Sequence, residues 1–248
     1  MHYTRILKQN IGNIISKSYG SLFLRNQKGL KVLMYHNIKD SDNFDLYKIK
    51  FESFKKQIFT IKKNNKDSKI LNLNEGMNSL NNIIITFDDA YNNIYKKVFP
   101  FLLENKIYFT IFVICRFLNT EHNEYISIKQ LKEMSESKYV TIGSHTYNHL
   151  NLCECNEKNM ESEIIESKKF LEDTIGKSVD YLSYPYGKYS DKVKKIVIRA
   201  GYEAAFSSKF GFFNDFKKMY EIPRLDIWST DNISSFNDKI SGKWNWYS

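Results

Sequence analysis

Two adjacent aspartates, Asp88 and Asp89, follow the apolar and β-branched run at residues 83–87. Such a run is typical of a buried parallel strand. Carboxylates side by side at a buried strand end repel each other and lose solvation, so a bound cation is the simplest explanation. The alternative is that Asp89 caps the next helix. We favour a cation, because a cap would account for only one carboxylate.

Two histidines, His145 and His149, follow another predicted strand. In a helical turn, side chains four residues apart lie on one face, so both imidazoles could bind one ion. With a carboxylate they would form a His₂-Asp set that leaves positions open for water and substrate. The spacing alone is common, but the chain has only five histidines and two stand here.

A third run, Ser183-Tyr184-Pro185-Tyr186-Gly187, places proline and glycine after a further predicted strand. These two residue types force a turn. Such a turn could aim a backbone N–H into a pocket, as a donor to an oxyanion would. Taken alone, the run would be better explained as an ordinary turn between a strand and a helix.

Alternating strands and helices would position these residues. Apolar runs predict strands at 31–35, 83–87, 108–114, 139–143, 179–184 and 202–206. Periodicity and capping residues predict helices at 51–64, 91–105, 127–137, 156–174 and 190–200, with Gly176 as a C-cap. This alternation indicates a parallel sheet, and six or seven strand–helix units fit a barrel better than an open sheet. The candidate residues would then meet at the carboxyl ends of the strands, where barrel active sites lie.

Length and composition fit one domain. The 248 residues are 42% hydrophobic, with 10 glycines and 3 prolines, which suits a folded α/β domain. We assign residues 31–248 to that domain and residues 1–30 to a basic extension. Apolar residues in the extension recur at helical spacing among Arg5, Lys8 and Lys17. It could lie on an anionic membrane surface or pack on the domain.

Charge and cysteine content limit the classes of binding partner and the cellular compartment that we expect. The net charge of +9 would attract polyanions, but no nucleic-acid-binding motif accompanies the scattered lysines, so we expect no nucleic acid. Three cysteines without a disulfide framework indicate a reducing compartment. No apolar run near the start is long enough for a signal peptide or a membrane span. We expect a cytoplasmic protein that could attach peripherally to the inner face of the membrane.

Three motifs in this order carry a resemblance to a known family: Thr86-Phe87-Asp88-Asp89, Ser144-His145-Thr146-Tyr147-Asn148-His149 and Ser183-Tyr184-Pro185-Tyr186-Gly187. Together they make the chain resemble the polysaccharide deacetylase family, the NodB homology domain or carbohydrate esterase family 4. The resemblance spans roughly residues 31–210. The first two motifs are highly specific as a pair.

The resemblance implies a distorted, incomplete (β/α)₇ barrel and a divalent metal, most often zinc, with nickel, cobalt and manganese as alternatives. It implies that Asp89, His145 and His149 hold the metal, and that Asp88 is the base that takes a proton from the attacking water. The backbone N–H of Tyr186 would stabilise the oxyanion.

The chain departs from the family pattern at two positions. Many members start the third motif with an arginine that orients the catalytic aspartate, whereas this chain has Ser183. Arg224, on a later predicted strand, could supply the guanidinium. Many members also have a late histidine as general acid, but none follows His149. His36, at the end of the first strand, could take that role, could bind the sugar or acetate, or could be purely structural.

The activity implied is removal of an N-acetyl group from a sugar of a surface polysaccharide or its lipid-linked precursor. Tyr147, Tyr184 and Pro185 would bind that sugar. A deacetylase of chitin-like or peptidoglycan chains is one alternative. A non-catalytic carbohydrate-binding barrel is another, although the complete set of two aspartates and two histidines argues against it.

Overall fold

The computed structural model describes residues 11, 12, 14, 15, 29–40, 43–64, 69–76, 81–119, 123–244 and 247. Within them, parallel strands close into a barrel in the order β1–β4–β5–β6–β7–β8–β9. Their bounds are β1 Lys31–Tyr35, β4 Ile83–Phe87, β5 Phe109–Val113, β6 Val140–Ser144, β7 Tyr181–Ser183, β8 Ala204–Phe210 and β9 Ile222–Asp226. A separate two-stranded parallel sheet pairs β2 (Asn37–Ile38) with β3 (Lys48–Ile49). The predicted seven-stranded α/β barrel is confirmed.

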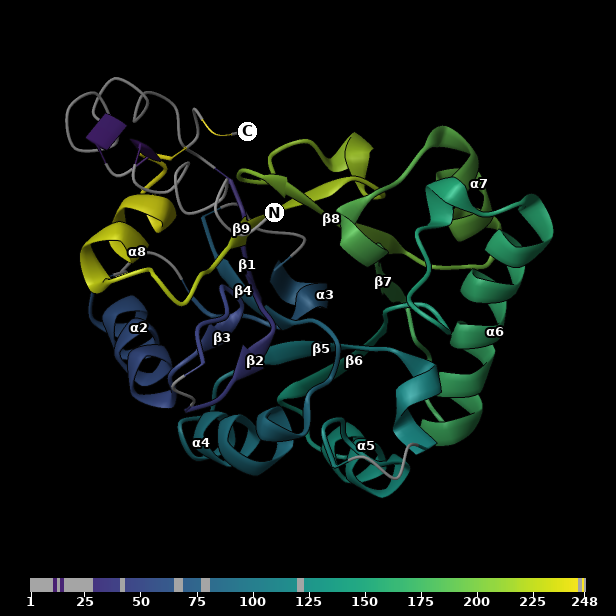
Figure 1. The fold of residues 1–248 in the computed structure, drawn as a ribbon, viewed down its shortest axis with the longest axis horizontal. Coiled ribbons are helices and arrows are strands. Elements are labelled where there is room, and N and C mark those ends of the chain that lie inside the picture. Colours follow the sequence, from purple (N-terminus) through teal and green to yellow (C-terminus); the bar gives the residue numbers. More distant parts are fainter. Residues whose placement is uncertain are drawn as a thin grey trace.

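Helices surround the barrel (Figure 1). The longer ones are α2 Phe51–Asn64, α4 Phe99–Glu104, α5 Ile128–Ser135, α6 Glu157–Ile175, α7 Asp191–Arg199 and α8 Ile233–Ile240. The short ones are α3 Leu73–Gly76, η1 Ile94–Val98, η2 Cys115–Asn119, η3 Leu152–Glu154, η4 Pro185–Gly187 and η5 Phe216–Lys218. The capping box of Ser127 and Gln130 and the left-handed cap at Gly176 are both present, as predicted.

The predicted helix at residues 91–105 differs from the observed structure. Ile94–Val98 forms a π-helical segment, and α4 begins only at Phe99. Pro100 lies in the first turn of α4. Proline lacks a backbone N–H and its ring displaces the carbonyl four residues earlier, so a regular α-helix cannot run through this position.

Two apolar layers hold the barrel. The inner cluster includes Val32, Ile84 and Phe112 from the strands. Leu73 and Phe213 join that cluster and close the amino end of the barrel, next to the starts of β1 and β4. The larger outer cluster packs the other faces of the strands against the helices. Apolar side chains thus fill the barrel from its amino end and leave the carboxyl end to polar residues.

The predicted N-terminal extension lies mostly outside the described residues. The described residues among 11–15 are helical, and Ile11 and Ile14 are exposed. Gly12 packs so closely on the Trp244 ring that a Cβ at this position would collide with it. In the part of the chain that is described, no helix has the length and apolar character needed to cross a bilayer. The domain boundary and the membrane contact stay predictions.

Candidate metal centre and active site

The barrel strands carry the predicted catalytic and metal-binding residues to one cavity of about 400 Å³. The backbone N–H of Asp88 donates to Tyr35 O at 2.9 Å, and that of His145 donates to Val113 O at 2.8 Å. Both bonds extend the pairing of the strands past their ends. Asp88, Asp89, His145, His149 and Arg224 all line the cavity, so parallel strand ends bring together residues that are distant in sequence.

Asp89, His145 and His149 form what we call the ligand set. Each offers one donor atom, and these atoms lie within 4.8 Å of one another. Asp89 Oδ1 is 3.5 Å from His145 Nε2 and 3.9 Å from His149 Nε2. Ligand atoms about 2.0–2.2 Å from a tetrahedral zinc ion lie roughly 3.3–3.6 Å from each other. The set therefore has the chemistry and nearly the spacing of a three-ligand zinc site.

Backbone contacts and burial prepare the imidazoles for metal binding. His145 Nδ1 donates to Ser183 O at 2.8 Å, which leaves Nε2 deprotonated and facing Asp89. Burial lowers the pKa of His145. Burial, followed by the neighbouring His145, lowers the pKa of His149 to about 4. Both rings are therefore neutral near pH 7, the form that binds a metal.

The prediction that the two histidines share a helix face is wrong. Residues 145–149 form no helix, because Thr146 and His149 have left-handed backbones with φ of 65° and 62°. Short polar bonds hold the loop instead. Ser144 Oγ accepts from Thr146 N at 3.1 Å, and Thr146 Oγ1 accepts from His149 N at 3.1 Å. The rings still converge, with centroids 4.6 Å apart.

Asp88, Arg224 and Ser183 form a second group, which we call the Asp88 clamp. Arg224 Nη1 and Nη2 donate to Asp88 Oδ1 and Oδ2, each at 2.8 Å. Ser183 Oγ donates to Asp88 Oδ2 at 3.1 Å and accepts from Arg224 Nη2 at 2.9 Å. Asp88 and Arg224 are only 2% and 1% exposed. Arg224 thus occupies the position beside the aspartate that the sequence suggested for it.

The two adjacent aspartates have opposite electrostatic environments. Burial alone would raise the pKa of Asp88, but the charge of Arg224 and its hydrogen bonds hold that pKa well below the usual range. Burial, followed by the charge of Asp88, raises the pKa of Asp89 to about 7. Asp89 also has a left-handed backbone, with φ of 70°. A cation beside Asp89 would remove this electrostatic cost.

A comparison with known protein families agrees with this geometry. The model of the polysaccharide deacetylase family matches residues 76–205. The chain belongs to the polysaccharide deacetylase family. A poly-β-1,6-N-acetyl-D-glucosamine N-deacetylase of Staphylococcus aureus is 30% identical over 214 residues, which cover 79% of this chain and 72% of that protein.

Solved structures show the same fold. The Streptococcus pyogenes deacetylase PplD, in complex with acetate, superposes with a TM-score of 0.78 at 22% identity, covering 86% of this chain and 98% of that one. A polysaccharide deacetylase from Bacillus cereus gives a TM-score of 0.76 at 27% identity, covering 86% of this chain and 69% of that one. The barrel is thus the fold of deacetylases.

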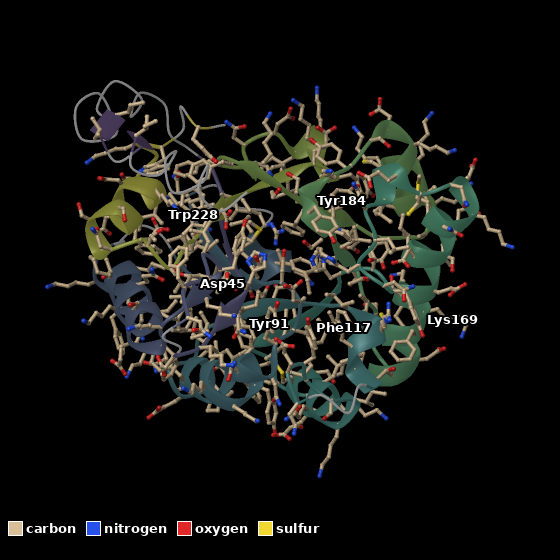
Figure 2. All side chains as sticks on the ribbon, viewed as in Figure 1. Asp45, Tyr91, Phe117, Lys169, Tyr184 and Trp228 are labelled. Carbon is tan, nitrogen blue, oxygen red and sulfur yellow. The ribbon has the colours of Figure 1, made fainter. Side chains whose placement is uncertain are left out.

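Of the three residues predicted to bind the sugar, Tyr184 alone lines this cavity of the deacetylase. Tyr147 packs against Phe170 of α6, and neither Tyr147 nor Pro185 lines the cavity. Tyr184 directly follows β7 (Figure 2). It forms part of the cavity wall but has no exposed surface. Its hydroxyl donates to Tyr220 O at 3.0 Å, so the polar tip is satisfied inside the core. A buried ring of this kind cannot stack on a sugar.

Other residues of the deacetylase form the mouth of the cavity. Tyr47, Lys188 and Ser208 line it without having been predicted, because no local pattern separates them from ordinary loop residues. Tyr186 is 62% exposed, and its ring lies 4.8 Å from that of His149. Ser208 Oγ donates to Tyr186 O at 3.2 Å, which ties the η4 turn to β8.

His36 also lines the deacetylase cavity, with its ring 4.4 Å from that of Tyr47. Burial lowers the pKa of His36 to about 4. The imidazole is therefore neutral near pH 7. This charge state favours the predicted hydrogen-bonding role of His36 over the role of general acid, which would need a protonated ring.

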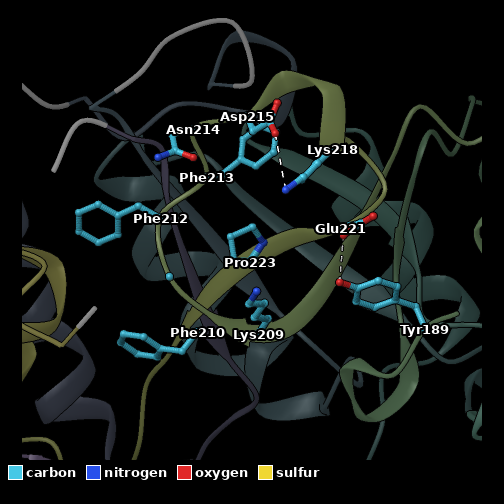
Figure 3. A pocket seen from close by; sticks show the side chains of 11 residues that line it. Tyr189, Lys209, Phe210, Phe212, Phe213, Asn214, Asp215, Lys218, Glu221 and Pro223 are labelled. Atoms are coloured by element: carbon cyan, nitrogen blue, oxygen red, sulfur yellow. Dashed lines mark hydrogen bonds and ion pairs between the residues drawn. The ribbon is translucent and has the colours of Figure 1, made fainter. Parts of the chain in front are cut away.

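A second cavity of about 260 Å³ lies between β8, η5 and β9 (Figure 3). Its carboxylates already have partners. Glu221 accepts from the Tyr189 hydroxyl at 3.3 Å, and Asp215 lies 3.7 Å from Lys218 Nζ. Glu221 also pairs with Lys194. Because these charges satisfy one another, the barrel mouth is the better candidate for the active site of the deacetylase.

Proposed function

We propose that this polysaccharide deacetylase is a metal-dependent hydrolase that removes the N-acetyl group from a sugar of a surface polysaccharide or its lipid-linked precursor. One observation carries the proposal. The ligand set and the Asp88 clamp face the same cavity, with Asp88 Oδ2 3.9 Å from His145 Nε2. A base and a candidate metal site are thus close enough to act on one water molecule.

The residues present fit a divalent metal. Asp89, His145 and His149 provide one carboxylate oxygen and two imidazole nitrogens, a donor set that suits zinc and leaves positions open. The half-buried carboxylate of Asp89, with its pKa raised to about 7, forms no ion pair with a lysine or arginine among the described residues. When bound, the metal supplies Lewis acidity, which polarises a carbonyl group and lowers the pKa of water.

Asp88 and Tyr186 would have different roles in the reaction. Asp88, kept ionised by Arg224, accepts a proton as water adds to the acetyl carbonyl. The backbone N–H of Tyr186 would stabilise the oxyanion. The C–N bond breaks, acetate leaves, and the sugar amine takes a proton. A carboxyl group with a lowered pKa releases its proton readily, so Asp88 can return it to the amine without a late histidine.

The test is acetate release from N-acetylated glycans, with and without a chelator. The panel should contain poly-β-1,6-N-acetylglucosamine, chitin oligomers and lipid-linked N-acetyl sugars. Release that survives complete removal of metal contradicts the metal-dependent reaction. We expect Asp88→Asn to abolish release and to leave metal content unchanged. Loss of metal in this variant would instead exchange the roles of Asp88 and Asp89.

The same panel decides between polymers. The similarity to the Staphylococcus aureus N-deacetylase supports a β-1,6-linked surface glycan. Faster release from chitin oligomers would favour the alternative activity on chitin-like or peptidoglycan chains. Metal bound with no release from any glycan would favour a carbohydrate-binding barrel.

A further inference from the structure

Helix α6 turns two polar side chains into the protein. Glu163 and Ser167, four residues apart, are 3% and 0% exposed. Lys169 lies on the outer face of the same helix (Figure 2). A carboxylate is rarely this buried unless it has partners that repay its desolvation. The partners of Glu163 therefore indicate what this carboxylate does.

Glu163 binds the loop that carries both candidate histidine ligands. Its two carboxylate oxygens accept from Asn148 N at 2.8 Å and from Asn148 Nδ2 at 2.6 Å. Asn148 directly precedes His149. Hydrogen bonds to a carboxylate are roughly twice as strong as neutral ones. The pair therefore fixes both the backbone and the side chain of Asn148.

Ser167 supports the other end of the same loop. Its Oγ lies 2.9 Å from Ser144 Oγ, and Ser144 Oγ accepts from Thr146 N at 3.1 Å. One face of α6 thus holds the loop on both sides of the left-handed residue Thr146. Non-glycine residues in this conformation cost of order 1 kcal/mol or more each, so the surrounding structure must impose it.

Electrostatics add to this mechanical role. The negative charge of Glu163 favours positive charge at His149, because it raises the pKa of that imidazole against the larger effect of burial. Within the described part of the chain, no lysine or arginine forms an ion pair with Glu163. A cation held by the ligand set would therefore be attracted by this buried charge as well as by Asp89.

We propose that Glu163 is a positioning residue of the metal centre, which holds the loop of His145 and His149 in the ligating arrangement through Asn148. This inference rests on the proposed function, because it takes the two histidines as metal ligands. Glu163 touches no ligand atom of the set and acts through Asn148. Outer residues of this kind typically change metal affinity about 10–100-fold when they are removed.

The experiment measures zinc affinity directly. Metal-free full-length protein is titrated with zinc in competition with a chromophoric chelator, and its melting temperature is recorded without metal. The variant is Glu163→Gln. The matched control is Glu172→Gln, because Glu172 also lies on α6 and accepts a backbone N–H, that of Val179 at 3.0 Å, away from the loop. We expect zinc affinity to fall about 10–100-fold in Glu163→Gln and to stay within about twofold of wild type in the control.

A swap of donor and acceptor tests the contact itself. In Glu163→Gln, the new amide can accept from Asn148 N, but its second group is a donor, so the Asn148 amide must turn over to accept from it, and the negative charge is lost. In Asn148→Asp, two carboxylates face each other, so zinc affinity should fall further. The double variant Glu163→Gln/Asn148→Asp restores a donor opposite an acceptor. We expect it to recover at least part of the affinity lost in Asn148→Asp.

The outcomes separate the two hypotheses. If wild-type protein binds no zinc or other divalent metal, the proposed function fails. If wild type binds zinc and Glu163→Gln binds it as tightly as the Glu172→Gln control, the positioning role is overturned. If Glu163→Gln does not fold, Asn148→Asp takes its place, because it sets two carboxylates against each other at the same contact, and unchanged zinc affinity in that variant overturns the proposal.

Discussion

The two halves of the candidate site are built differently. In the Asp88 clamp, Arg224 and Ser183 belong to strands β9 and β7, and Asp88 directly follows β4. Its opposite charges are buried and bonded to each other. In the ligand set, Asp89 and His149 have left-handed backbones. The imidazoles beside Asp89 are kept neutral by burial, and the charge of Asp88 acts on Asp89 more strongly than the opposite charge of Arg224.

This difference predicts which half needs a ligand. The clamp satisfies its charges within the protein, so Asp88 is ionised and oriented before any ligand arrives. The ligand set places a carboxylate in a site that disfavours its charge, and a bound cation would remove that cost. Metal binding should therefore stabilise the folded protein through the ligand set and leave the clamp unchanged.

The largest expected effect comes from His149→Ala. Loss of one of three ligands should weaken zinc binding by more than about 100-fold and abolish deacetylation, since removal of mere outer-shell partners already costs 10–100-fold. The metal-free variant should unfold at nearly the wild-type denaturant concentration, because the side chain is 21% exposed. Zinc titration measures the loss of metal binding, and urea unfolding measures the stability of the metal-free variant. Tight zinc binding by this variant would remove His149 from the ligand set.

Arg224→Met should lower stability and spare zinc binding, which is the reverse of what we expect for His149→Ala. It leaves Asp88 as a buried charge without its partner, which should destabilise the protein by about 3–5 kcal/mol. Deacetylation should fall strongly, whereas zinc affinity of the folded fraction should stay near wild type. Arg224→Lys keeps the charge but cannot donate to both carboxylate oxygens in the same geometry. Its stability and its deacetylation rate should lie between those of wild type and Arg224→Met. A large loss of zinc affinity in Arg224→Met would mean that the halves are not independent.

Asp89→Asn tests whether the fold disfavours the charged form of Asp89 when no metal is bound. The pKa of Asp89 is raised from about 4 in the unfolded chain to about 7 in the fold. The folded state therefore binds the extra proton between these values, and the contribution of Asp89 to the free energy of unfolding decreases as pH rises toward 7.

The measurement is the difference in unfolding free energy, wild type minus Asp89→Asn, between pH 5 and pH 8. We expect this difference to decrease by on the order of 2 kcal/mol as pH rises. Comparison with the variant cancels the contributions of the histidines. In saturating zinc, the free energy of unfolding should instead increase with pH in wild type, and it should not do so in Asp89→Asn. A difference that does not change with pH would show that Asp89 is not in a site that disfavours its charge.

Ser183→Ala should have the smallest effect. It removes the hydrogen bond from Ser183 to Asp88 and the one that Ser183 accepts from Arg224, and leaves both bonds from Arg224 to Asp88 in place. The free energy of unfolding should decrease by about 0.5–1.5 kcal/mol, and the catalytic rate should fall by about tenfold or less. Equilibrium unfolding and acetate release measure the two effects. A loss as large as that of Arg224→Met would make Ser183 an equal partner in the clamp.

Local sequence was enough to predict the barrel and the convergence of its site. Apolar runs at 31–35 and 83–87 are strands, and Asp88 and His145 stand at strand ends as expected. This succeeds because strand propensity depends on a few consecutive residues. In a parallel barrel, every carboxyl end lies at the same rim, so residues after strands must meet.

Tertiary structure decided what those residues contact. Arg224 could be suggested as a partner of Asp88, but only closure of β9 against β1 brings the two together across 136 positions of sequence. The loop of His145 and His149 is not helical, because α6 holds it in another conformation through Glu163. Tyr184 is fully buried, and its hydroxyl is bonded inside the core. Burial, pKa and ion pairing depend on neighbours supplied by distant segments, and no local pattern contains that information.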